Sequence, residues 1–237
     1  MVRIIKEYHE RKNELLDIAQ ELFLTKGYEK TSVDNIIKKV DIAKGTFYYY
    51  FRSKEDLLDK LTKRMTDKIQ IEIKKIVKKT DLDAISKLEK AYSVAGNIKL
   101  ENIHLIKLML KILYEDDNLI LRYKVYKSNV ELVVPEFAKI IEQGVKEKLF
   151  NTPYPYETAR LFFELGSILG DTISKHFLKL DEKPENMDKM VKEIEVYEDA
   201  IERILGAKKG TIIIVNREML KNFQEKLKIQ KIKGNSF

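Results

Sequence analysis

The stretch KGTFYYYFRSKEDL, residues 44–57, places three tyrosines side by side at Tyr48, Tyr49 and Tyr50. Exposed aromatic side chains are costly on a protein surface unless a partner covers them. Double-stranded DNA is a suitable partner. A phenol hydroxyl can donate a hydrogen bond to a phosphate oxygen, and a phenol ring can pack against a sugar or a thymine methyl group. The tyrosines therefore predict a surface that binds DNA without covalent chemistry.

The residues around the tyrosines fit the same chemistry. Lys44 and Lys54 bracket them and can neutralise phosphates, which releases counterions and makes binding weaken as salt rises. Gly45 has no side chain, so the backbone there can approach a base edge closely. Thr46 adds a hydroxyl group to the same segment.

Helical spacing predicts which of these side chains face outward. At about 100° per residue, Phe47 and Phe51 fall on one side of a helix over 44–51, with Thr46 and Tyr49 opposite them. The phenylalanines are expected to anchor this helix to a core formed by Leu22, Phe23, Ile36 and Val40. An alternative interpretation is a buried aromatic cluster that only joins two helices.

Apolar periodicity and capping residues predict the elements that position this segment. Helices are expected over about 9–26, 33–40, 44–51, 54–79, 82–98, 100–114, 117–148, 155–180 and 187–205. Thr31 and Ser32 are candidate N-caps for the second helix, and Ser53 for the fourth. Pro135 is expected to kink or divide the helix over 117–148. Two short helices about four residues apart fit a helix-turn-helix, whose second helix enters the major groove of DNA.

The predicted fold class is all-α, in three parts. Residues 1–53 form a three-helix DNA-binding domain, and residues 54–206 form a larger helical domain for ligand binding and dimerisation. Residues 207–237 form a basic extension, with a strand over Thr211–Val215 and a helix over 216–231.

Composition limits the other classes of protein. The 237 residues include no cysteine, which excludes disulfides and thiolate metal sites and favours a reducing compartment, so we expect a cytoplasmic protein. The first residues lack the apolar core of a signal peptide, and no aliphatic run is long enough to span a bilayer, so no membrane partner is expected. His9 and His176 have no partner at ligand spacing, and neither a metal nor a cofactor is expected.

The net charge of +7 is unevenly distributed. Residues 1–53 carry 10 lysines and arginines against 8 acidic residues, residues 54–205 carry 27 against 28, and residues 206–237 carry 8 against 2. Because the C-terminal residues hold almost all the excess, the isoelectric point is weak support for DNA binding. The prediction rests on the local pattern.

That local pattern resembles a known family. Thr31-Ser32-Val33, and then the block from Ile42 to Leu57 with its G-T-F-Y-x-Y-F-x-S-K-E-x-L motif, are similar to the DNA-binding domain of TetR/AcrR transcriptional regulators over about residues 10–58. The resemblance implies a homodimer that binds a pseudo-palindromic operator in double-stranded DNA, acts as a repressor, and is released by a small molecule. No enzymatic activity is expected.

The resemblance also assigns roles to residues. It implies phosphate contacts for Tyr48 and Lys54, and a hydroxyl and backbone amides presented to phosphate by Thr31 and Ser32. It implies positions at or near base edges for Lys44, Gly45, Thr46, Tyr49 and Tyr50.

Several residues depart from the family pattern, among them Ile37, which stands where a small alanine is usual. Asp41 stands where a glycine is usual and tolerates the left-handed conformation. Ala43 stands where a serine would cap the recognition helix, a loss of about 1 kcal/mol. Asp34 stands where a basic residue is frequent and would repel phosphate. These changes bear on operator affinity rather than on the fold.

The larger domain offers candidate effector contacts, because a ligand pocket needs apolar and aromatic walls with a few polar groups. The candidates are His104, Leu105, Leu108, Met109, Ile112, Tyr123, Tyr126, Phe137, Phe162 and Phe163. An ordinary core would show the same residues, and His104 is as readily an exposed or satisfied histidine. We expect an effector that is partly apolar.

The helices over 155–180 and 187–205 are the expected dimer seam. Gly166 and Gly170 are small enough to let a neighbouring helix come close, although an intramolecular core has the same pattern. A twofold dimer would place its recognition helices about 34–36 Å apart, or farther if two dimers share the operator.

Two other classes of function are alternatives to a regulator. An enzyme has little support, because the sequence has no phosphate-binding loop, no cysteine nucleophile and no metal spacing. A helical adaptor that has lost sequence-specific DNA binding is the other alternative, and Asp34 and Ala43 keep it open. Discrimination between operator-like and scrambled duplexes separates a regulator from both.

Overall fold

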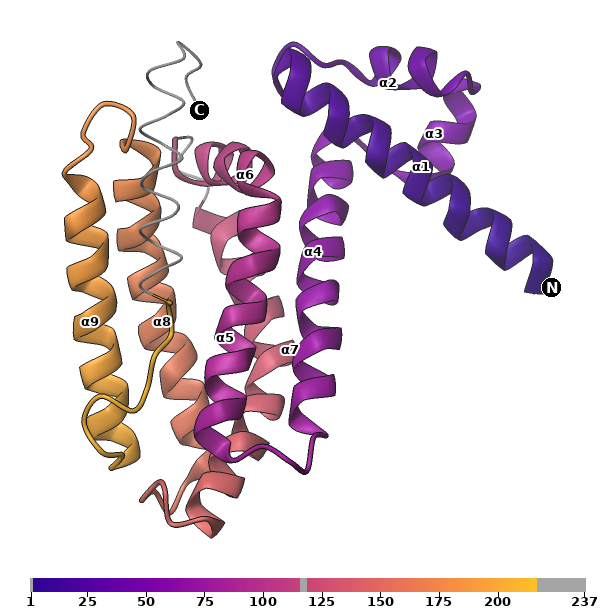
Figure 1. Cartoon of the computed structure of the whole chain (residues 1–237). Helices are drawn as coiled ribbons and strands as arrows, with labels where there is room; N and C mark the ends of the chain where they lie inside the picture. The colour runs from indigo at the N-terminus through magenta and orange to yellow at the C-terminus, as the bar shows by residue number, and fades with distance from the viewer. Residues whose placement is uncertain (1, 116–118, 217–237) are drawn as a thin grey trace. The chain divides into compact units, whose positions relative to one another are not determined.

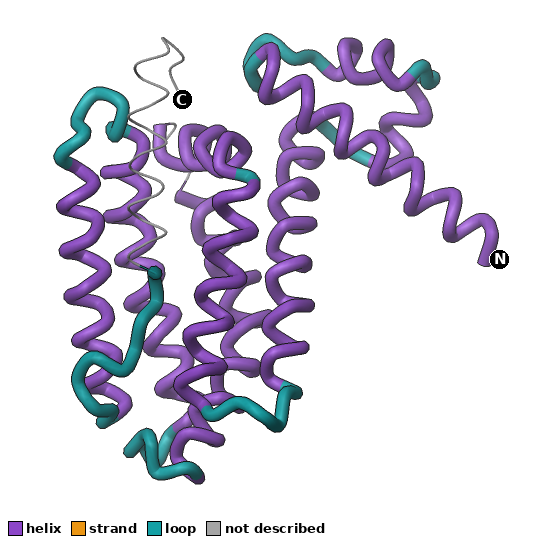
Figure 2. The backbone as a smooth tube through the Cα atoms, viewed as in Figure 1, coloured by secondary structure: helices purple, strands orange, loops and turns teal. Residues whose placement is uncertain are grey.

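The structure is a computed structural model that describes residues 2–115 and 119–216. Within these residues the chain forms nine helices and no strand, drawn in Figure 2 as purple segments joined by teal loops. The predicted all-α fold with an N-terminal helix-turn-helix is therefore confirmed. The helices, labelled in Figure 1, are α1 (Val2–Lys26), α2 (Val33–Val40), α3 (Lys44–Tyr50), α4 (Lys54–Val77), α5 (Ala84–Glu101), α6 (Ile103–Glu115), α7 (Leu119–Lys146), α8 (Pro155–Leu178) and α9 (Asn186–Leu205).

The chain divides into two compact units. The first comprises residues 1–68 together with 104–109, and the second comprises residues 69–103 together with 110–237. Both α4 and α6 contribute residues to each unit.

The first unit is built on the apolar face of α1. Leu15, Ala19 and Phe23 are buried on that face, and α1 packs on α2, which packs on α3. The same core takes in Ile36, Phe47, Phe51, Leu57, Leu58 and Leu61. Each large apolar side chain removed from water contributes about 1.5–3 kcal/mol to folding. This burial holds the two short helices, which are too short to be stable alone.

In the second unit, α7 is continuous across Pro135. Of the two effects expected of Pro135, a kink or a division of the helix, division is therefore excluded. Proline removes one amide donor and frees a carbonyl one turn earlier. Three residues before Pro135, the carbonyl oxygen of Leu132 accepts a hydrogen bond of 3.1 Å from the Gln70 Nε2 group.

In the same unit, α8 and α9 lie side by side, as Figure 1 shows. The Tyr197 hydroxyl of α9 donates a 2.9 Å hydrogen bond to the carbonyl oxygen of Phe162 on α8. A Cβ atom on Gly166 would lie 3.2 Å from that hydroxyl oxygen, whereas one on Gly170 would have no neighbour within 4 Å. The close approach that Gly166 allows is therefore intramolecular. The remaining core near the α8–α9 turn includes Ile173, Phe177, Leu180, Met187 and Met190.

The chain leaves α9 through Gly206, whose φ of 61° is the left-handed conformation that favours glycine. The segment 211–215 is not a strand, so that prediction is wrong. Its backbone amides donate hydrogen bonds to side-chain carboxylates instead of to a neighbouring strand. Ile212 N and Ile214 N each donate a 2.9 Å hydrogen bond, to Glu202 and Glu198 of α9. The helix predicted over 216–231 lies almost wholly outside the described residues.

No helix in the described ranges 2–115 and 119–216 has the length and apolar character needed to cross a membrane.

Candidate nucleic-acid interface

The turn between α2 and α3 is set by three local features. Ser32 caps α2, because its hydroxyl oxygen accepts a hydrogen bond from Asn35 N while the Asn35 side chain accepts one from Ser32 N. Asp41 ends α2 in the left-handed conformation, with φ 56° and ψ 55°, as predicted for the residue that replaces glycine. Ala43 precedes α3 without a side-chain cap, also as predicted.

The recognition helix α3 buries its phenylalanines and exposes two tyrosines. Phe47 and Phe51 have almost no exposed surface, and their ring centroids lie 5.6 Å apart. Tyr48 is 49% exposed and Tyr49 is 72% exposed. The predicted orientation of α3 is confirmed, and the alternative of a buried tyrosine cluster is excluded for these two side chains.

Tyr50 differs from its two neighbours, because it is only partly exposed. Its ring centroid lies 4.9 Å from that of Tyr8 on α1. Burial first, and then Tyr49 and Tyr8, raise the pKa of Tyr50, while Arg11 lowers it. The phenol therefore stays protonated at neutral pH and keeps a hydroxyl that can donate.

The two lysines that bracket α3 have different surroundings. The Lys44 ammonium group lies 3.6 Å from Oδ1 of Asp34, and both side chains are well exposed. The Lys54 ammonium group donates a 2.9 Å hydrogen bond to the Tyr28 carbonyl oxygen and lies 4.1 Å from the centre of the Tyr28 ring. Lys54 is thus held in place, whereas Lys44 shares its charge with a carboxylate.

The remaining predicted DNA contacts separate into exposed and buried groups. Gly45 is exposed, and a Cβ atom there would have no neighbour within 4 Å. Ser32 is exposed and Thr46 partly so. Thr31 is fully buried, and its hydroxyl bonds to the carbonyl oxygens of Gly27 at 2.8 Å and Leu22 at 3.2 Å. The expectation that Thr31 presents its hydroxyl to phosphate is therefore corrected: that group closes the turn after α1.

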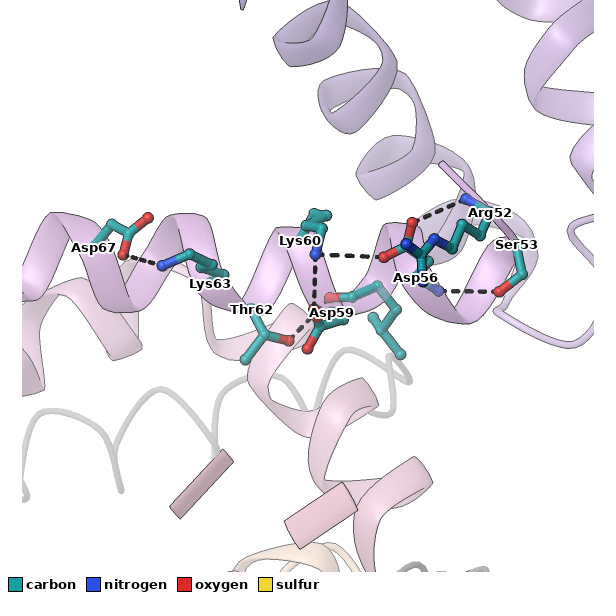
Figure 3. Close-up of polar contacts among 9 residues, drawn as sticks. Arg52, Ser53, Asp56, Asp59, Lys60, Thr62, Lys63 and Asp67 are labelled. Atoms are coloured by element: carbon teal, nitrogen blue, oxygen red, sulfur yellow. Dashed lines mark hydrogen bonds and ion pairs between the residues drawn. The ribbon is translucent and has the colours of Figure 1, made fainter. Parts of the chain in front are cut away.

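The start of α4 fixes the backbone that carries Arg52 and Lys54. Figure 3 shows that the Ser53 hydroxyl accepts a 3.2 Å hydrogen bond from Asp56 N, while Asp56 Oδ2 accepts a 2.9 Å bond from Arg52 N. Farther along the helix, the Lys60 ammonium nitrogen lies 3.4 Å from Oδ1 of Asp56. Ser53 is therefore the N-cap that the sequence predicts.

The predicted effector contacts are distributed over both units. His104, Leu105, Leu108 and Met109 belong to the first unit and the other six to the second. His104 and Tyr123 are exposed, Leu105, Met109, Phe137 and Phe162 are buried, and Leu108, Ile112, Tyr126 and Phe163 are partly exposed.

An aromatic cluster does form inside the second unit. The ring of Phe137 lies 5.3 Å from that of Phe163 and 5.6 Å from that of Tyr92, which the sequence analysis missed. Burial raises the pKa of Tyr197 to about 12, and burial followed by the nearby Tyr197 raises the pKa of Tyr92. Both phenols are therefore neutral hydrogen-bonding groups at physiological pH.

Within the described ranges, no three His, Cys, Asp or Glu side chains are grouped so that they could hold a metal ion.

The comparisons with known proteins agree with this geometry. The model of the bacterial regulatory proteins of the tetR family matches residues 15–61, which contain α2, α3 and the start of α4. The chain is 27% identical over 186 residues to the HTH-type transcriptional repressor KstR2 of Rhodococcus jostii, covering 72% of this chain and 88% of KstR2.

Two further relatives match mainly through the N-terminal domain. The uncharacterised HTH-type transcriptional regulator YuxN of Bacillus subtilis is 42% identical over 72 residues, covering 30% of this chain. QacR of Staphylococcus aureus, an HTH-type transcriptional regulator, is 41% identical over 46 residues, covering 19%. The chain spans only about a quarter of the length of these two relatives, 25% and 24%.

Solved structures share the fold over most of the chain. A TetR-family regulator from Pectobacterium atrosepticum has a TM-score of 0.62 at 16% identity, covering 84% of this chain and 96% of that one. A transcriptional regulator from Cytophaga hutchinsonii has a TM-score of 0.55 at 24% identity, covering 81% and 93%.

Proposed function

Because the chain belongs to the TetR family of bacterial regulatory proteins, we propose that it is a sequence-specific DNA-binding transcriptional repressor. The observation that carries the proposal is the orientation of α3. Phe47 and Phe51 are buried, and Tyr48 and Tyr49 are presented outward between Lys44 and Lys54. The surface thus combines aromatic groups that can cover base edges with cations that can pair with phosphate. The family is one of bacterial regulatory proteins, and bacterial chromosomal DNA lies in the cytoplasm, where the proposed repressor acts.

The residues of this surface have two roles in the proposal. Lys54 and the Tyr48 hydroxyl contact phosphates and set the register, while Thr46 and Tyr49 lie at base edges and supply sequence preference. Gly45 lets the helix approach the groove closely, which fits its open surroundings. Ser32 and the amides at the start of α2 face a phosphate, a role supported by the exposure of Ser32.

We propose that the protein acts as a homodimer through α8 and α9. Ile168 is 66% exposed, Val196 is 60% exposed, and Leu161 is also exposed, so both helices carry apolar side chains that a second copy would cover. Ile168→Glu should therefore give a monomer in sedimentation, with α-helical content unchanged. A variant that stays dimeric would show that the dimer interface lies elsewhere on the protein.

We propose further that a partly apolar small molecule in the larger domain releases the protein from DNA. The cluster of Phe137, Phe163 and Tyr92, with the Tyr197 hydroxyl on the neighbouring helix, supplies aromatic walls and polar groups of the kind that such a ligand needs. Release requires the ligand to bind one conformation better than the other.

The proposed function is tested by selection of binding sites. The wild-type protein is used to enrich duplexes from a random-sequence pool, and the enriched duplex is compared with its scrambled form across a salt series. A repressor prefers the enriched duplex by a wide margin, and its affinity for both falls as salt rises. Equal binding to both duplexes would instead support the helical adaptor.

Gly45→Ala adds a control on folding to the same experiment. Alanine in a helix is more stable than glycine by about 0.5–1 kcal/mol, and the added methyl group meets nothing in the free protein. The variant should therefore be at least as stable as the wild type while binding the enriched duplex more weakly. Unchanged affinity would show that Gly45 does not lie in the DNA interface.

A further inference from the structure

The N-terminal helix brings a further tyrosine, Tyr8, against the recognition helix. Tyr8 lies on α1, ahead of residues 15–61 that the family model matches. Its ring centroid is 4.9 Å from that of Tyr50 and 5.7 Å from that of Tyr49, and the rings of Tyr49 and Tyr50 lie 5.0 Å apart. Three rings from two helices thus form one cluster, where α1 passes α3 in Figure 1.

Two of the three ring pairs in the cluster have a favourable edge-to-face geometry. Tyr8 meets Tyr49 edge to face with an interplanar angle of 83°, and Tyr49 meets Tyr50 edge to face at 84°. Centroid separations of about 4.5–7 Å with offset or edge-to-face rings are the preferred arrangement of aromatic pairs. These contacts are therefore attractive.

The position of Tyr8 follows from the periodicity of α1. Tyr8, Leu15 and Leu22 are seven residues apart, and a helix advances only about 20° out of register over seven residues. Leu15 and Leu22 are buried in the core of the first unit. Tyr8 thus lies on the same face of α1 as Leu15 and Leu22, beyond the core. Its ring packs against Tyr49 and Tyr50 of α3.

We propose that Tyr8 is a positioning residue for DNA recognition, which holds the rings of Tyr49 and Tyr50 in the orientation that meets the duplex. The proposal rests on the proposed function of α3. Tyr49 is 72% exposed, so the rest of the domain does little to fix its side chain. A side chain that is ordered before binding loses less entropy when the complex forms. Tyr8 therefore affects sequence recognition while its own hydroxyl touches no DNA.

Three variants test this role. Tyr8→Ala removes the ring, and Tyr8→Phe keeps the ring without the hydroxyl. Leu24→Ala removes an exposed apolar side chain, 43% exposed, elsewhere on α1. Each variant is compared with the wild type on the duplex that the wild type enriches from a random pool, and on its scrambled form. Should Tyr8→Ala unfold, Tyr8→Leu replaces it, because leucine keeps apolar volume without an aromatic ring.

Tyr8→Ala should lose about threefold to tenfold of its affinity for the enriched duplex, the size expected for one aromatic pair. Affinity for the scrambled duplex and the salt slope should not change, because no phosphate contact is lost. Tyr8→Phe and Leu24→Ala should bind as the wild type does. An equal loss on both duplexes, or no rescue by phenylalanine, would overturn the positioning role.

A measurement without DNA completes the test. With 13C-labelled tyrosine rings, the signals of Tyr49 and Tyr50 are assigned from their phenylalanine variants. Both signals should shift in Tyr8→Ala, because the ring current of Tyr8 is removed, and neither should shift in Leu24→Ala. Unmoved signals would refute the contact itself. Failure of the wild type to prefer any duplex would refute the proposed function instead, so the two failures are distinguishable.

Discussion

The Lys54 ammonium group lies 4.1 Å from the centre of the Tyr28 ring and donates a hydrogen bond of 2.9 Å to the Tyr28 carbonyl oxygen. A cation over an aromatic face is stabilised by about 0.5–1 kcal/mol when exposed. The turn that follows α1 therefore fixes the cation that follows α3.

Lys54→Ala should weaken binding to the enriched and the scrambled duplex by the same factor, because a phosphate contact carries no sequence information. The slope of log affinity against log salt should decrease by about one phosphate contact. Tyr28→Phe, which keeps both the ring and the carbonyl group, is the matched control and should leave the slope unchanged. Fluorescence anisotropy over a salt series measures both quantities. A loss confined to the enriched duplex would assign Lys54 to base recognition.

Asp34→Asn should raise DNA affinity while slightly lowering stability. The carboxylate lies 3.6 Å from the Lys44 ammonium group and repels phosphate, so its removal frees one cation for DNA. The same carboxylate is in the first turn of α2, where a negative charge stabilises the helix by about 0.3–1 kcal/mol. The affinity for scrambled DNA should therefore rise, while the urea concentration at the midpoint of unfolding should fall. A fall in affinity would show that Asp34 contributes to recognition.

Ala43→Ser should stabilise the first unit by about 1 kcal/mol, because α3 begins without a side-chain cap. Ser32→Ala is the reciprocal control and should cost about the same, because Ser32 already caps α2. Urea unfolding followed by circular dichroism measures both changes. If Ala43→Ser had no effect, the first amides of α3 would already be satisfied.

Asp83 should make the free energy of unfolding decrease as the pH falls into the acid range. It caps α5, and the hydrogen bond from the Ser86 backbone amide, followed by one from the Ser86 side chain, lowers the pKa of Asp83. A carboxyl whose pKa is lower in the folded state stabilises the fold above its unfolded pKa, about 3.9, and loses this contribution as pH falls. Asp83→Asn caps without titrating, so it should resemble the wild type near neutral pH and lose less stability below about pH 4. Parallel acid-induced losses in both proteins would contradict this assignment.

The orientation of α3 was predictable from sequence because it depends on helical period alone. Phe47 and Phe51 are four residues apart and face one core, which leaves Tyr49 on the opposite side. The caps Ser32 and Ser53 were predictable for the same reason, since a cap and its partner amide lie within three residues.

Features that depend on tertiary contacts were not predictable in this way. Thr31 and Ser32 are both residue types that cap helices, and only the fold shows that the Thr31 hydroxyl is directed to carbonyl groups of the preceding turn. The run 211–215 has the residue types of a strand, but its amides at Ile212 and Ile214 bond to buried carboxylates. The contact of Tyr8 with α3 had a sequence signal, its seven-residue spacing from Leu15, but its partner lies more than forty positions away.

The effector contacts were the least predictable, because helical spacing does not say which helices face each other. Phe137 and Phe163 meet across α7 and α8, as a pocket would require, while Tyr123 points outward. Tyr92, which joins the same cluster, has no motif that would single it out.

The central claim, that α3 presents tyrosines to DNA, is tested most directly by tyrosine modification. The protein is nitrated with tetranitromethane, free and bound to the enriched duplex, and the modified peptides are quantified by mass spectrometry. Tyr48 and Tyr49 should react in the free protein and be protected in the complex. Tyr154, which is 65% exposed at the start of α8, should react equally in both. Equal nitration of Tyr48 and Tyr49 with and without DNA would contradict the account.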